Sequence, residues 1–177
     1  MSEMTNKEKN EYVGYEYKDV TVKRSMESVY ADGYSNFGWT IEGSSTPIGK
    51  PDSVVLKFKR DRKIRNKAEL TRLQRQFDTC ISEILSLESS KYIKASTVAY
   101  IIGVVGTAFM AGSVFEVIAD KIIASVILAI PGFVGWIIPY FIYCKIVSAK
   151  TQQVTPLIDE KYDEIYDVCE KANSLIS

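Results

Sequence analysis

The sequence contains no histidine, and one long stretch of the chain is almost without charge. The missing histidine excludes Ser-His-Asp and Cys-His catalysis, histidine-ligated metals and an imidazole switch near neutral pH. Between Ala95 and Cys144 only Glu116, Asp120 and Lys121 are charged. The 22 basic and 22 acidic residues of this 177-residue chain therefore cluster elsewhere, and we expect a membrane protein with a polar half.

Two uncharged runs predict membrane-spanning helices. Residues 95–115 form a run of 21 residues, and residues 122–144 form another of 23. Some 20 helical residues, rising about 1.5 Å each, cross a hydrocarbon core of roughly 30 Å. We expect transmembrane helices at residues 95–117 and 122–147. The six-residue connection Glu116–Lys121 makes them an antiparallel hairpin.

The basic residues predict the orientation of this hairpin. Residues 1–94 hold 17 of the 22 basic residues, whereas the turn holds only Lys121. Basic residues accumulate on the cytoplasmic side of a membrane. We therefore expect a multi-pass protein of the cell membrane, with both termini in the cytoplasm.

Small residues recur along both spans at spacings that let helices approach closely. They would pack the hairpin against itself or against a second copy. A pore or transport path through an oligomer is the alternative, and the scarcity of ionisable groups within the spans argues against ion transport. The predicted helix-packing residues are Gly103, Thr107, Ala108, Ala111, Gly112, Gly132 and Gly135.

Residues 1–65 predict a small cytoplasmic α+β domain with the element order β-α-β-β. Alternating β-forming residues, broken by a loop rich in Gly and Pro at residues 43–52, indicate the strands. These strands are expected at residues 15–24, 39–42 and 53–60.

The helix of this domain is expected between the first two strands, at residues 28–37. Ser25 is its predicted N-cap and Gly38 its predicted C-cap. The aromatic residues Tyr30, Tyr34, Phe37 and Trp39 are interpreted as core rather than as a ligand platform.

Two heptad-like patterns predict a cytoplasmic two-helix stalk. A helix at residues 66–94, capped by Asn66 with Glu69, leads into the first span. A second helix at residues 155–176 begins with Thr155 as N-cap and Pro156 at the first helical position. We expect the two to pair antiparallel, like a coiled coil. The seam residues are Leu70, Leu73, Phe77, Cys80, Ile84 and Leu87 in the first helix, and Ile158, Tyr162, Ile165, Cys169 and Ala172 in the second.

A basic block is the feature best suited to binding. Residues 54–75 carry a net charge of +7, and residues 148–177 carry −3. One interpretation is a solvated strand end and helix start, partly neutralised by the acidic helix; the other is contact with anionic lipid head groups. Nucleic acid is not expected. The possible lipid contacts are Lys57, Lys59, Arg60, Arg62, Lys63 and Arg65.

The sequence contains no recognisable catalytic, cofactor-binding or metal-ligand motif, so we expect no cofactor and no enzymatic activity. An enzyme that uses Asp, Tyr or Lys on a lipid substrate is a minor alternative.

Several segments resemble an uncharacterised family of small two-span membrane proteins from Gram-positive bacteria. The segments are GYSNFGW (33–39), FKRDRKI (58–64), ELTRLQRQFD (69–78), GTAFMAGS (106–113), PGFVGW (131–136) and TPLIDEKYDEIYD (155–167). The resemblance implies a bacterial cytoplasmic membrane and no known function. The expectation from the whole sequence is a membrane-anchored interaction or scaffold module that associates with itself, and an oligomeric channel or small-solute transporter is the alternative.

Overall fold

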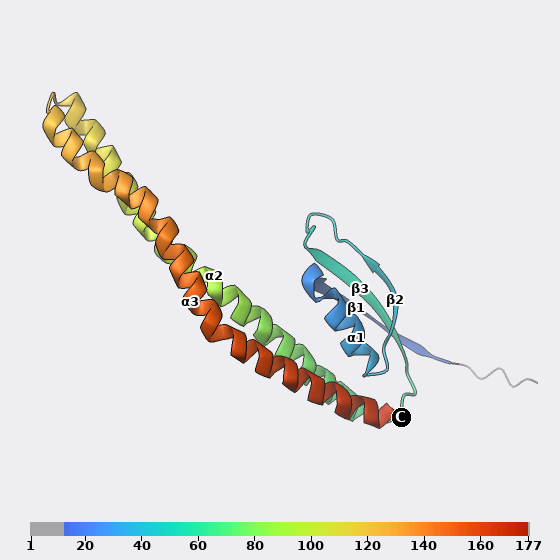
Figure 1. Ribbon diagram of the computed structural model, residues 1–177. Helices are drawn as coiled ribbons and strands as arrows, with labels where there is room; N and C mark the ends of the chain where they lie inside the picture. The colour runs from blue at the N-terminus through green and yellow to red at the C-terminus, as the bar shows by residue number, and fades with distance from the viewer. Residues whose placement is uncertain (1–12, 177) are drawn as a thin grey trace, which may run out of the picture. The chain divides into compact units, whose positions relative to one another are not determined.

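The computed structural model describes residues 13–176 and contains an α+β arrangement with a helical hairpin (Figure 1). The elements are β1 (Tyr15–Lys23), a 3₁₀ turn (Arg24–Met26), α1 (Glu27–Ser35), β2 (Thr40–Ser45), β3 (Ser53–Asp61), α2 (Lys67–Ile118) and α3 (Ile122–Ile176). The predicted β-α-β-β order is confirmed. The first twelve residues, which the sequence assigned to the α+β domain, lie outside the described residues.

The chain divides into two compact units. The α+β unit comprises the chain up to Thr79 together with the chain from Glu164 onward. The helical unit comprises Cys80–Asp163, which includes the two uncharged runs.

In the α+β unit, the three strands form an antiparallel sheet in the order β1-β3-β2. Tyr15 lies opposite Asp61 and Lys23 opposite Ser53, so β1 and β3 pair along their whole length. Because β1 and β2 both pair with β3, the β1-α1-β2 connection places α1 across one face of the sheet (Figure 1). Among residues 13–176, Lys57 is exposed on the other face, which we call the open face.

The core of this unit is rich in aromatic rings, as the sequence predicts. Tyr34 of α1, Phe37 in the turn after α1, Phe58 of β3 and Phe77 of α2 are each at most 1% exposed. The Tyr34 and Phe58 rings stack with their centroids 4.7 Å apart. Trp39 is also buried, whereas Tyr30 is only half-buried. Burying such rings supplies most of the packing free energy of a small domain.

The helix boundaries of α1 differ from the prediction. Ser25 lies within the 3₁₀ turn and the N-cap position is Met26, which makes no side-chain cap. The start is instead fixed by a long-range bond, since the Arg24 amide donates to the Asp52 carbonyl at 2.8 Å. The C-cap is Asn36, and Gly38 adopts φ +79° two residues later, in the turn that leads to β2.

The helix α2 is continuous through the predicted stalk and the first uncharged run. Asn66 precedes it with φ +54° and donates from its amide to the Leu175 carbonyl, while the Glu69 carboxylate accepts from Arg72. The expected capping box is therefore replaced by these contacts. Five of the six predicted seam residues are buried, and Leu87 is half-buried.

The helix α3 is also continuous, so the predicted helix start at residues 155–156 is wrong. The Thr155 hydroxyl donates to the Thr151 carbonyl at 2.8 Å instead of capping a new helix. Pro156 removes one backbone donor, but Val154 and Ile158 on either side of it are buried and hold the helix together. The turn between the helices is also shorter than expected, at residues 119–121.

The seam of α3 is shifted by one residue in part of its length. Tyr162 is exposed, and the half-buried residue at this level is Lys161, whose ammonium lies 2.8 Å from Glu83. The observed spacing remains 4, 3, 4, 3, 4, as a heptad pattern requires. The residues on this line are Val154, Ile158, Lys161, Ile165, Val168 and Ala172.

Candidate functional site

The basic block does not form one uniform surface, because Arg60 lies in the interior. Its side chain is 4% exposed, and its guanidinium bonds to the Glu16 carboxylate and the Phe37 carbonyl. The same guanidinium lies 4.3 Å from the centre of the Trp39 ring. Lys67 completes the arrangement by binding the second oxygen of Glu16. Arg60 therefore stabilises the fold and is not available to a lipid head group.

The other five predicted lipid-contact residues are at the surface. Lys57 is exposed on the open face of the sheet, and Lys59 on the same face pairs with Glu42 at 2.9 Å. The remaining three lie between β3 and α2, are exposed, and form no ion pair within residues 13–176. We refer to these three, Arg62, Lys63 and Arg65, as the basic turn.

In the helical unit, the backbones of α2 and α3 are in close contact at a pair of glycines. A Cβ atom on Gly106 would lie 3.0 Å from the Gly135 Cα, and one on Gly135 would lie 2.7 Å from the Gly106 Cα. The backbones thus touch with no room for a side chain. Gly135 is among the predicted packing residues, whereas Gly106 is the contact that the sequence pattern missed.

Two further predicted glycines line the same contact. A Cβ on Gly132 would lie 2.7 Å from the Met110 side chain, and one on Gly112 would lie 2.7 Å from Leu128. Large residues of one helix thus fit over small residues of the other, as close packing requires.

The remaining predicted packing residues lie outside this contact. A Cβ on Gly103 would meet nothing within 4 Å, and Ala108 and Ala111 are exposed. Thr107 is also exposed and accepts a hydrogen bond of 3.3 Å from the Trp136 indole. Trp136 and Pro139 of α3 therefore lie near Gly103 and Thr107, whereas Ala108 and Ala111 are left exposed by residues 13–176.

A polar network crosses the interior of the α+β unit. Lys18 donates to the Tyr34 hydroxyl at 2.9 Å, and this hydroxyl donates to the Asp78 carboxylate at 3.0 Å. Nearby, the Trp39 indole donates to the Gln74 side chain at 2.9 Å. These bonds tie β1, α1 and α2 together, because each polar group would be costly to bury without its partner.

The ionisable groups of this interior have shifted pKa values. Burial raises the pKa of Asp78, although Lys18 opposes the shift. Burial together with the Asp78 charge raises the pKa of the Tyr34 phenol far above its ordinary value, so the phenol stays protonated. Burial would also raise the pKa of Glu16, but the bonds from Lys67 and Arg60 outweigh it and hold this pKa below its ordinary value.

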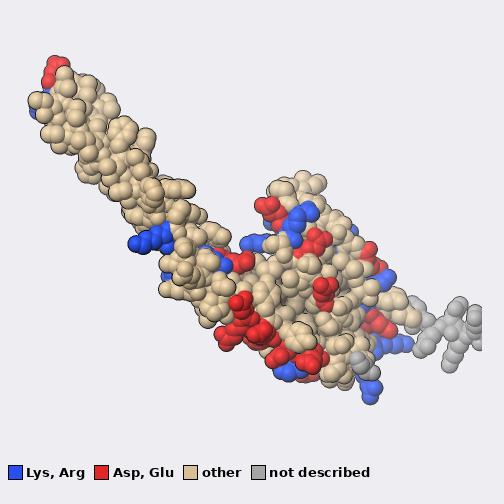
Figure 2. All heavy atoms as spheres, in the orientation of Figure 1, with Lys and Arg blue, Asp and Glu red and all other residues tan. Residues whose placement is uncertain are grey.

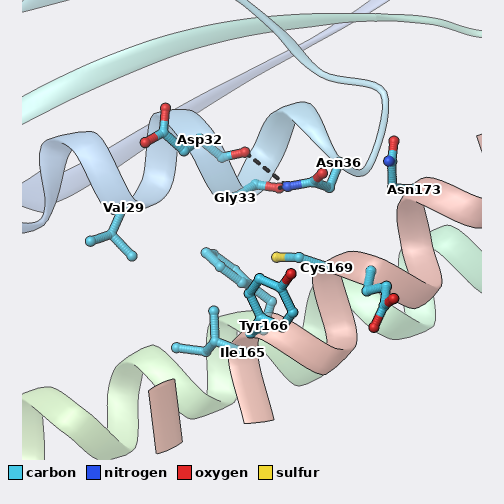
Figure 3. A pocket seen from close by; sticks show the side chains of 10 residues that line it. Val29, Asp32, Gly33, Asn36, Ile165, Tyr166, Cys169 and Asn173 are labelled. Atoms are coloured by element: carbon cyan, nitrogen blue, oxygen red, sulfur yellow. Dashed lines mark hydrogen bonds between the residues drawn. The ribbon is translucent and has the colours of Figure 1, made fainter. Parts of the chain in front are cut away.

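A pocket of about 390 Å³ opens between α1 and the C-terminal part of α3 (Figure 3). Its lining includes Asp32 and Gly33 of α1, Asn36 just after α1, and Ile165, Tyr166 and Cys169 of α3. Figure 3 shows the Asp32 side chain directed away from α3. We refer to the pocket as the α1/α3 groove. Its full lining is Val29, Asp32, Gly33, Asn36, Phe77, Ile165, Tyr166, Cys169, Glu170 and Asn173.

The lining of the groove combines apolar and acidic residues. Phe77 and Ile165 are buried, and the two acidic residues of the lining, Asp32 and Glu170, are exposed. The lining contains no Lys or Arg. Burial raises the pKa of the half-buried Cys169 thiol, so this group is a poor nucleophile at neutral pH. The groove is therefore suited to binding a positively charged group rather than to covalent chemistry.

Within residues 13–176, no group of three or more His, Cys, Asp and Glu side chains is arranged to hold a metal ion.

Comparisons with protein-family models, with curated proteins and with solved structures find no match to this chain. The resemblance to small two-span bacterial proteins therefore stays a prediction.

Proposed function

We propose that the protein is a non-enzymatic, membrane-anchored interaction module, in which the helical hairpin holds the α+β unit at the cytoplasmic face of a membrane. The module associates with itself and presents binding surfaces to the cytoplasm. Three features motivate this proposal: an apolar hairpin, a folded polar unit and the absence of histidine from the sequence.

The observation that carries this proposal is the exposure of apolar side chains in the helical unit. Both helices are long and apolar enough to cross a membrane, judged by length and composition, and only 11% of the residues in each apolar stretch are buried. Tyr100, Phe115 and Ile123 are 74%, 70% and 79% exposed. Water-soluble proteins rarely expose contiguous apolar surface on this scale, so a bilayer is the natural environment.

The charge distribution supports the same proposal. In the space-filling view, the hairpin is nearly free of charged side chains until its turn (Figure 2). Two hydroxyls of the hairpin bond to the helix backbone: Thr107 donates to the Gly103 carbonyl and Ser113 to the Met110 carbonyl. A membrane anchor needs no ionisable group within its helices, whereas transporters place ionisable groups at the centre of theirs.

Membrane extraction tests the proposal directly. The full-length protein should sediment with membranes, remain there in alkaline carbonate and in high salt, and enter solution only with detergent. Release by carbonate or salt would contradict the anchoring role. Reproducible ion-selective conductance of the purified protein in planar bilayers would replace the scaffold role with that of a channel.

A further inference from the structure

The ion pairs described within residues 13–176 do not link the basic block of the α+β unit to its acidic helix. The ion pairs that involve residues 54–75 run to Glu16, Glu42 and Glu69, and none of them joins this block to α3. Exposed acidic side chains gather over the C-terminal part of α3 (Figure 2). The partial neutralisation of the basic block by the acidic helix therefore stays a prediction.

The α1/α3 groove has the shape and charge to receive a Lys or Arg side chain. These side chains combine an aliphatic stem with a cationic head, so the stem can lie on apolar surface while the head stays at the rim. Phe77 and Ile165 offer apolar surface, and Asp32 and Glu170 are the two exposed acidic residues of the lining. A volume of about 390 Å³ accommodates one such side chain with part of its backbone.

The chain itself carries a matching group. The basic turn presents Arg62, Lys63 and Arg65 on a short exposed connection, where their heads have no acidic partner among the described residues. The lining of the groove includes none of the three. The turn and the groove of one copy therefore remain separate, and both are open to another copy.

We propose that the α1/α3 groove is the docking site for the basic turn of a second copy of this chain. This inference rests on the proposed self-association and assigns its cytoplasmic contact. The formal net charge of the chain is zero, so copies can approach without overall repulsion while the two patches of opposite sign align them. Anchoring in a shared membrane raises the effective concentration of the partners.

Paired charge reversals test this assignment. One full-length variant carries Asp32→Lys with Glu170→Lys, and the other carries Arg62→Glu, Lys63→Glu and Arg65→Glu. Self-association of each in detergent micelles, measured by analytical ultracentrifugation, should be at least about tenfold weaker than that of the natural protein. An equimolar mixture of the two variants should associate again, because the reversed patches are complementary. Raising the salt concentration should weaken the natural association.

A control on the same helix is Asp167→Lys, since Asp167 is exposed but does not line the groove. It should associate like the natural protein. Thermal unfolding shows whether each variant is folded. If the groove variant is not folded, the milder Glu170→Gln replaces it.

Unchanged association of both reversed proteins, or a mixture that fails to recover, would overturn the inference. Loss on reversing the groove but not the turn would also overturn it and would assign the groove to another segment of this chain. These failures leave the carbonate-resistant membrane binding intact, so they are distinguishable from failure of the anchoring role.

Discussion

Gly106 and Gly135 meet backbone to backbone, and neither position has room for a methyl group. We expect Gly135→Ala to push the helices apart, because the new Cβ would lie 2.7 Å from a backbone atom that cannot rotate away. Overpacking of this kind costs about 1–3 kcal/mol, which a lower Tm of the protein in detergent would report.

Gly103→Ala is the matched control for this change, since its Cβ would meet nothing within 4 Å. Alanine is favoured over glycine in a helix by roughly 1 kcal/mol, so this variant should be as stable as the natural protein or slightly more stable. Equal losses of stability at both positions would mean that the helices do not approach at Gly106.

Glu16 makes the stability of the α+β unit depend on pH in the acidic range. Its pKa is held below the ordinary 4.5 by Lys67 and Arg60 against the effect of burial. The stabilisation is therefore complete above pH 4.5 and is lost as the pH falls through the lowered folded-state pKa. At pH 7, Glu16→Gln should lower the free energy of unfolding by about 2 kcal/mol, because the buried Arg60 loses its counter-charge.

Urea unfolding at several pH values measures this effect, and the difference between the two proteins should shrink below pH 4.5. Glu69→Gln is the control, because the Glu69–Arg72 pair also lowers a carboxyl pKa but lies on the surface. Surface ion pairs contribute little to stability, so Glu69→Gln should lower the free energy of unfolding much less than Glu16→Gln. An equal effect of the two substitutions would contradict the structural role of Glu16.

Tyr34→Phe should weaken the polar network by removing the hydroxyl that Lys18 and Asp78 share. Lys18 and Asp78 would each lose the Tyr34 hydroxyl as a hydrogen-bond partner, which should lower the free energy of unfolding by about 1–3 kcal/mol. Tyr30→Phe is the control, because within residues 13–176 the Tyr30 hydroxyl forms no hydrogen bond. If the two variants unfold at the same urea concentration, the network does not stabilise the fold.

Tyr34→Phe should also change how the stability of the α+β unit depends on pH. Burial raises the pKa of Asp78, so its contribution to stability is complete below the ordinary 3.8 and is lost as the pH rises through the raised folded-state value. The Tyr34 hydrogen bond lowers this pKa, and Tyr34→Phe should therefore move the loss to higher pH. An NMR titration of the Asp78 carboxyl in both proteins measures the shift.

The sequence predicted what depends on local periodicity. Strand alternation located β1 and β3, and the heptad spacing located the buried line of α2 from Leu70 to Ile84. The same alternation could have found Arg60, because it continues the inward series Val54, Leu56, Phe58. It was assigned to the surface from its charge alone, although its cross-strand neighbour is Glu16.

What depends on long-range contact was not predictable. Lys18, Tyr34 and Asp78 come from three elements, 16 and 44 residues apart, and no local pattern connects them. Gly106 was missed because α2 carries small residues on more than one side, so spacing alone does not reveal which side meets α3. The α1/α3 groove likewise needs the fold to bring Asp32 and Glu170 to the lining of one pocket.

The orientation of the hairpin is the last prediction. Since 17 of the 22 basic residues lie in residues 1–94, the turn at residues 119–121 should face away from the cytoplasm. In a chain whose three cysteines are replaced by alanine, Ala119→Cys should react with a membrane-impermeant maleimide in intact cells. Ser45→Cys, on the exposed edge strand β2, should react only after the cells are permeabilised. The reverse pattern would invert the topology, and the basic turn and the α1/α3 groove would then face the outside of the cell.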